Sequence, residues 1–124
     1  MNRKTPPSIN PVTGFLFKKP EVVKTSSGNS VYFFNDPSND ALKIDLVFGA
    51  GTTIQSKALQ AKATLKNIFS GTEKLTQYEI ANGFDNFGTY TDVTIGEYHC
   101  EITLFCTAKH FKDFWQLFIS SIMC

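Results

Sequence analysis

The chain has few of the residues that mark secreted, membrane or nucleic-acid-binding proteins. It contains three cysteines and two histidines among 124 residues. No stretch reaches the ~18 consecutive apolar residues that a membrane-spanning helix needs. The 12 basic and 11 acidic side chains give a net charge of +1, which provides no general attraction to nucleic acid or to anionic lipid. We therefore expect no nucleic acid and no membrane among its partners.

The three cysteines match no disulfide or zinc-binding pattern. Cys100, Cys106 and Cys124 lack CxxC spacing. Cys100 and Cys106 would face the same side of one strand about 20 Å apart, too far for a disulfide. We expect reduced thiols in or near the core. Because no apolar run follows the first charges, a signal peptide is not indicated, and a soluble, cytoplasmic location is expected, or a periplasmic one if a leader was removed.

Hydrophobic periodicity divides the chain into five strand-like and three helical segments. The strand-like segments are 21–25, 30–35, 42–48, 89–95 and 97–107. The helical segments are 58–69, 76–87 and 111–123. This order, β-β-β-α-α-β-β-α, predicts an α+β fold in which helices pack on one face of a mainly antiparallel sheet. Four of the five prolines lie in residues 1–20, which predicts an extended N-terminal arm.

The last helical segment carries a continuous stripe of large apolar side chains and has no stop signal. The stripe consists of Phe111, Phe114, Trp115, Phe118, Ile119, Ile122 and Met123. We therefore expect residues 21–124 to be the first portion of one longer domain. Because such a stripe is costly to expose to water, we expect the chain to form a homodimer, unless the helix folds over the sheet of its own chain.

The segment 58–72 resembles a metal-binding helix of a known peptidase family. Ala61, Phe69, Gly71 and Thr72 stand at the matching places of Gly-x-Ala-His-x-x-Glu-His-x-x-Phe-x-Gly-Thr. This element is typical of pitrilysin- and insulinase-type zinc peptidases, the inverzincins, whose His-x-x-Glu-His motif places two imidazoles and a carboxylate on one helix. The resemblance implies a peptidase scaffold and extends over residues 21–124.

The residues that perform catalysis in that family are absent here. The two histidine positions hold Lys62 and Lys66, and the glutamate position holds Leu65. An ammonium group repels a zinc ion, and a leucine cannot take a proton from water. The resemblance therefore implies that the chain is not an enzyme and binds no cofactor, although active relatives bind zinc. The two lysines are interpreted either as a solvated helix flank or as a contact for a carboxylate of a partner.

Shorter matches support the resemblance and suggest a peptide-binding strand. Residues 27–31 resemble Asn-Gly-x-x-Val, and residues 48–52 resemble the end of the strand before the metal helix. Gly88 and Thr94 match Gly-Gly-x-x-Asn-Ala-x-Thr, whereas Thr91 and Asp92 replace its Asn-Ala. In active relatives this strand, here Thr91, Asp92, Val93 and Thr94, is an edge that binds extended peptides. The alternative is an ordinary strand paired inside the sheet.

The sequence thus predicts a non-catalytic homologue of pitrilysin/insulinase-type zinc peptidases. Its expected role is that of a structural or peptide-binding partner of an active peptidase subunit, or of the remainder of its parent chain. One alternative is a metal-dependent peptidase with a relocated site, because Glu97, His99 and Glu101 recur at i, i+2 and i+4 along a predicted strand. Another is an inactive fragment of a longer peptidase-like protein.

Overall fold

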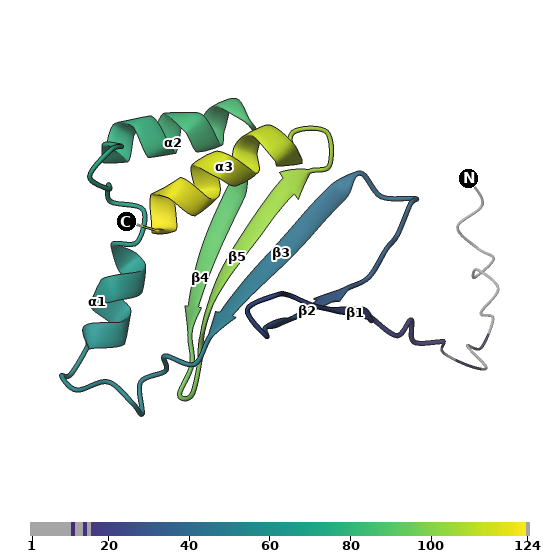
Figure 1. Cartoon of the computed structure of the whole chain (residues 1–124), viewed down its shortest axis with the longest axis horizontal. Helices are drawn as coiled ribbons and strands as arrows, with labels where there is room; N and C mark the ends of the chain where they lie inside the picture. Colours follow the sequence, from purple (N-terminus) through teal and green to yellow (C-terminus); the bar gives the residue numbers. More distant parts are fainter. Residues whose placement is uncertain (1–10, 12–13, 15, 124) are drawn as a thin grey trace, which may run out of the picture. The chain divides into compact units, whose positions relative to one another are not determined.

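The computed structural model describes residue 11, residue 14 and residues 16–123 (Figure 1). The chain consists of two compact units, and the boundary between them along the chain lies between Asp36 and Pro37. The elements are β1 (Glu21–Lys24), β2 (Ser30–Phe33), β3 (Ala41–Phe48), α1 (Gln60–Lys66), α2 (Gln77–Asn86), β4 (Tyr90–Ile95), β5 (Cys100–Thr107) and α3 (Phe111–Ile122). The predicted order and the α+β class are confirmed.

The first unit contains an antiparallel hairpin. In β1 and β2, Val22 pairs with Tyr32 and Val23 pairs with Val31. The turn between the strands is closed by the backbone N–H of Asn29, which donates to Thr25 Oγ1 at 3.1 Å. Within the described residues, these two strands form a sheet of their own, so the five strands make two sheets. Residues 16–20 have no regular secondary structure, and most of the predicted arm lies outside the described residues.

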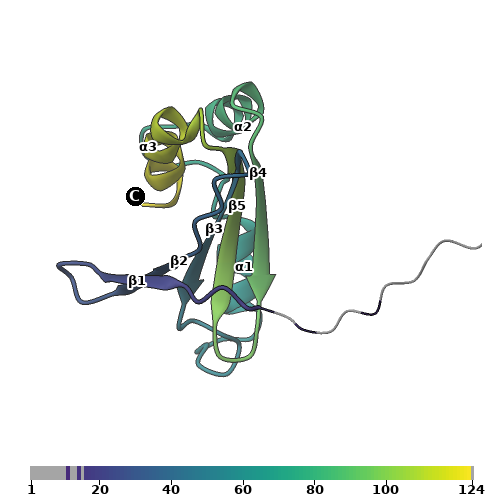
Figure 2. The same cartoon turned by 90° about the vertical axis from the view of Figure 1, so that its right-hand side faces the viewer.

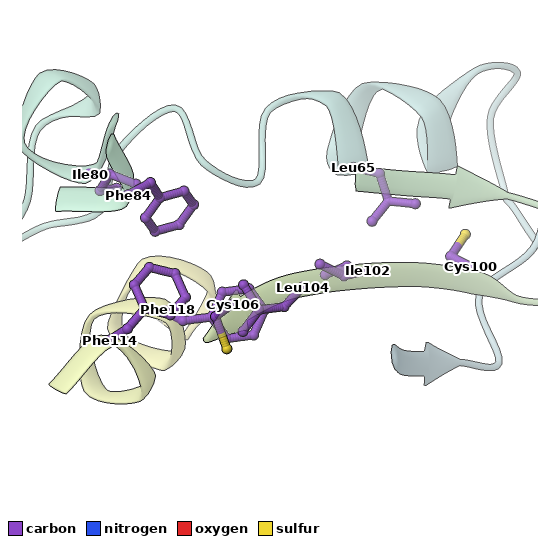
Figure 3. Packing of buried hydrophobic residues seen from close by; sticks show 9 residues of the cluster. All are labelled: Leu65, Ile80, Phe84, Cys100, Ile102, Leu104, Cys106, Phe114 and Phe118. Carbon is purple, nitrogen blue, oxygen red and sulfur yellow. The ribbon is translucent and has the colours of Figure 1, made fainter. Parts of the chain in front are cut away.

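The second unit is built on a three-stranded antiparallel sheet in the order β3-β5-β4. The central strand β5 pairs with both neighbours along its length: Leu104 lies opposite Ile44 of β3, and Ile102 lies opposite Val93 of β4. Alternate residues of β5 point to one face and are at most 5% exposed; they are Cys100, Ile102, Leu104 and Cys106. Figure 3 shows this row facing apolar side chains of all three helices.

The helices cover that face of the sheet through aromatic packing. Phe114 and Phe118 of α3 are fully buried, and the Phe114 ring lies 5.0 Å from that of Phe84 of α2. Helix α3 therefore packs against the sheet of its own chain, as Figure 2 also shows. This burial of Phe114 and Phe118 weakens the reason for expecting the helix to drive dimer formation, although the oligomeric state stays a prediction.

Local signals determine where α2 begins and ends. The hydroxyl of Thr76 accepts from the N–H of Glu79 at 3.3 Å, and the Glu79 carboxylate accepts from the N–H of Thr76 at 2.8 Å. This is the predicted capping box, and it satisfies two donors at the start of the helix. Gly88 follows the helix with φ of 59°, a left-handed conformation that glycine adopts without steric cost.

Most predicted boundaries lie within two residues of those in the structure. Two elements, α1 and β5, differ by three residues at one end. Helix α1 is shorter than the predicted segment 58–69, because Leu59 has φ of 66° and so stands outside the helical geometry. Strand β5 begins at Cys100 and not at Glu97, because residues 96–99 form a turn in which Gly96 N–H donates to His99 O at 2.9 Å. Among the described residues, no helix has both the length and the apolar character that crossing a bilayer requires.

Candidate functional site

The three positions that match the zinc motif lie on different sides of α1. An α-helix turns by about 100° per residue, and Leu65 lies on the side of α1 that packs onto the sheet. Leu65 is 6% exposed and belongs to the core, and Ile68 packs against it. Lys62 and Lys66 are one turn apart on an exposed flank of the same helix. A buried leucine between two exposed lysines provides neither a metal ligand nor a general base.

An apolar groove of about 690 Å³ lies along the other flank of α1. Its floor comes from β3 and β5 and its far wall from the end of α3. No lining residue carries a charge, and neither Lys62 nor Lys66 is among them. Polar groups at its rim bond to one another, since Ser56 Oγ donates to Gln60 Oε1 at 2.9 Å. The groove is therefore separate from the lysine flank.

Strand β4 is an edge of the sheet. Within the described residues it pairs with β5 alone, so its outer backbone groups have no strand partner. Antiparallel pairs alternate between residues that bond to each other and residues whose N–H and C=O point away. Gly96 and His99 form a bonded pair, so along β4 every second residue before Gly96 is bonded to β5. The residues between them, Thr91, Val93 and Ile95, direct their N–H and C=O groups outward. The predicted segment thus offers a free edge, with its main-chain donors and acceptors directed outward.

The side chains of β4 divide between the two faces of the sheet. Thr91, Val93 and Ile95 point to the face covered by the helices and are half-buried. Asp92 and Thr94 point to the opposite face and are exposed. The four residues predicted to bind peptide therefore present two different surfaces along one edge.

The structure does not gather the residues of the alternative metal site. Glu97 and His99 lie in the exposed turn before β5, whereas Glu101 lies within β5 and accepts a hydrogen bond from Thr103 Oγ1 at 3.4 Å. Throughout the described part of the chain, no three His, Cys, Asp or Glu side chains are grouped so that they could hold a metal ion. The regular i, i+2, i+4 spacing fails because the strand starts later than the alternation suggested.

A polar network that the sequence analysis missed lies on the sheet face opposite the helices. Lys43 Nζ and Asp45 Oδ2 form an ion pair at 2.7 Å, and Thr103 Oγ1 donates to Asp45 Oδ1 at 2.9 Å. Burial raises the pKa of Asp45, but the hydrogen bonds from Lys43 and Thr103 outweigh it and leave the pKa below its ordinary value. The sequence signal that could have revealed this network is a pair of polar residues, Asp45 and Thr103, that lie opposite each other on neighbouring strands. The network ties β3 to β5.

The two described cysteines are structural. Cys100 and Cys106 are free and buried, as predicted, and Cys124 lies outside the described residues. The thiol of Cys100 donates to the carbonyl of Ala50 at 2.8 Å. Burial raises the pKa of Cys106, so its thiol stays protonated near neutral pH. Cys106 therefore lacks the activated thiolate that a nucleophile requires.

The fold is one that a peptidase also uses. Neither a protein-family model nor a curated protein sequence matches the chain. A solved structure does: a protease from Helicobacter pylori, at a TM-score of 0.69 and 13% identity. The match covers 83% of this chain and 26% of that protease, so the chain spans about a quarter of the length of its structural relative. At this identity, the likeness shows a shared fold.

Proposed function

We propose that the chain is a non-catalytic homologue of pitrilysin/insulinase-type zinc peptidases. In this proposal it binds extended peptides and serves as the structural partner of an active peptidase subunit. The observation that carries it is the occupation of the three motif positions by Lys62, Leu65 and Lys66 on a helix of a protease-like fold. The buried position of Leu65 adds support, because an ionised carboxylate at that place would lose its hydration.

Peptide binding is proposed to occur by strand addition at β4. Main-chain hydrogen bonds supply the affinity in this mode of recognition, and they do not depend on the catalytic residues. Thr91, Val93 and Ile95 direct their N–H and C=O groups outward along the free edge. A peptide lying there in extended form would extend the sheet by one strand.

Catalysis is tested by incubating the purified chain with zinc and denatured casein or mixed peptides. We expect no hydrolysis that a chelator suppresses, because a lysine pair cannot hold the ion. Metal-dependent turnover that survives further purification would refute the proposal.

Peptide binding is tested by fluorescence anisotropy with short labelled peptides of extended character. Val93→Pro should abolish binding, because proline removes the outward-pointing N–H of an edge strand. A peptide methylated at alternate backbone nitrogens provides a complementary test, since it removes the hydrogen bonds that the peptide would donate to the carbonyl groups of the edge and leaves the protein unchanged. If the methylated peptide binds as tightly as its parent, recognition does not occur by strand addition.

A further inference from the structure

The exposed flank of α1 lies on the same side of the molecule as the free edge of β4. Helix α1 packs beside β4, and Figures 1 and 2 both show it running alongside the strands. The apolar groove opens on the flank of α1 that faces β3 and β5. Since β3 and β4 are opposite edges of this sheet, the other flank, with Lys62 and Lys66, is directed toward the outer side of β4.

This flank has unbalanced positive charge. Between Asp45 and Glu73 the charged residues are Lys57, Lys62 and Lys66, all basic. Neither Lys62 nor Lys66 forms an ion pair or a hydrogen bond with any residue that the structure describes. A ligand lying between this flank and the strand edge would therefore meet two ammonium groups with no carboxylate to neutralise them.

The spacing of the two lysines matches that of an extended peptide. Lys62 and Lys66 are four residues apart on a helix, a rise of about 6 Å. Alternate residues of an extended strand are about 6.6 Å apart. Peptide residues opposite Thr91, Val93 and Ile95 would place their side chains on the helix-covered face, because directly paired residues share a face. Two successive side chains on that face could thus approach one lysine each.

On the sheet face opposite the helices, the edge strand disfavours acidic side chains in the peptide. Asp92 is exposed there and would repel an acidic side chain of the added strand. Acidic residues are consequently favoured at alternate positions of the peptide and disfavoured at the positions between them.

We propose that the chain selects extended peptides in which acidic residues alternate with uncharged ones, and that Lys62 and Lys66 pair with these carboxylates. This inference rests on the proposed peptide binding at β4 and specifies its ligand. The two positions that match metal ligands in the resembling family would here supply positive charge from lysine, directed at the side chains of the peptide.

The test compares three short capped peptides that differ only at alternate positions. These positions hold glutamate, glutamine or lysine, and the intervening residues are threonine. Each peptide is titrated by anisotropy against the parent chain, the double variant Lys62→Gln/Lys66→Gln, and the control Lys112→Gln. Lys112 is an exposed lysine of α3, away from the strand edge, so its exchange changes net charge without altering the proposed contact.

We expect the glutamate peptide to bind the parent chain about 2- to 30-fold more tightly than the glutamine peptide, because this is the gain in affinity that two exposed ion pairs typically provide. This preference should vanish in the double variant, remain in the control, and decline as salt is added. Binding of the lysine peptide should be the weakest of the three.

The outcomes separate this inference from the proposed function. Equal binding of the glutamate and glutamine peptides, with loss on backbone methylation, overturns the acidic preference and leaves strand addition intact. A glutamate preference that is unchanged in the double variant also overturns it, since the contact would lie elsewhere. Failure of all three peptides to bind contradicts both the inference and the proposed edge.

Discussion

Replacing Gly51 with alanine should loosen the connection that holds the end of β4 in place. Three backbone hydrogen bonds join residues 51–53 to the turn 96–99: Gly51 N–H to Tyr98 O at 3.3 Å, Thr52 N–H to Gly96 O at 3.1 Å, and Thr53 N–H to Glu97 O at 2.9 Å. A Cβ atom on Gly51 would collide with the backbone carbonyl of Glu97. Backbone atoms cannot rotate away as a side chain can, so the two segments must separate.

The expected cost follows from the hydrogen bonds that this separation breaks. At about 0.5–1.5 kcal/mol each, three bonds amount to roughly 1.5–4.5 kcal/mol of unfolding free energy. Urea denaturation followed by tryptophan fluorescence measures it, because Trp115 is the single tryptophan and packs 5.7 Å from Phe118 in the core. The backbone of Gly51 is not left-handed, so the penalty is steric.

Gly49→Ala is the matched control for this experiment. A Cβ atom on Gly49 would meet nothing within 4 Å, so the exchange should be neutral or stabilise the fold by about 0.4–1 kcal/mol. If Gly51→Ala is no less stable than Gly49→Ala, the close approach between residues 51–53 and the turn does not hold in solution. This contact would then not hold the end of β4 in place.

Two further predictions concern α2 and the oligomeric state. Hydrogen bonds from the backbone and side chain of Thr76 lower the pKa of Glu79 below its ordinary value of 4.5. The stability that Glu79 contributes should therefore be complete above pH 4.5 and lost as the pH falls through the lowered pKa; thermal melts of Glu79→Gln against the parent chain should show a flatter acid dependence. The homodimer expected from the sequence is tested by sedimentation equilibrium at micromolar concentration: a species of twice the chain mass would support it, and a lone species of 13.9 kDa would contradict it and show that packing of Phe114 and Phe118 within one chain suffices.

Local sequence signals predicted those elements whose boundaries depend on near neighbours. The capping box formed by Thr76 and Glu79 defines the start of α2, and Gly88 marks its end because the backbone there is left-handed. Alternation along 42–48 identified β3, since one face of that strand is half-buried and the other is exposed. In these cases the physical cause lies within a few residues of the boundary.

Long-range contacts explain what the sequence pattern could not predict. Alternation of polar and apolar residues continues through Glu97 and His99, yet β5 starts at Cys100, because the preceding turn bonds to a loop more than forty residues earlier in the chain. The apolar groove arises in the same way, from side chains of strands and helices that are distant in sequence. The residues proposed for the site come from the sequence, whereas the geometry around them depends on these long-range contacts and could not be predicted.

The three positions that correspond to the zinc motif have different surroundings, and this difference bears on what the chain can do. Leu65 is 6% exposed within the core, where an ionised glutamate would lose its hydration. Lys62 and Lys66 are exposed on one flank of the same helix, and we infer that this flank is directed toward the edge that β4 leaves open. Hydrolysis requires all three positions to act on one metal ion, whereas recognition of an extended acidic peptide requires only a free edge and two nearby cations. In the proposed function, the three motif positions therefore supply no catalysis, and peptide binding would depend on the free edge of β4 and on the two lysines.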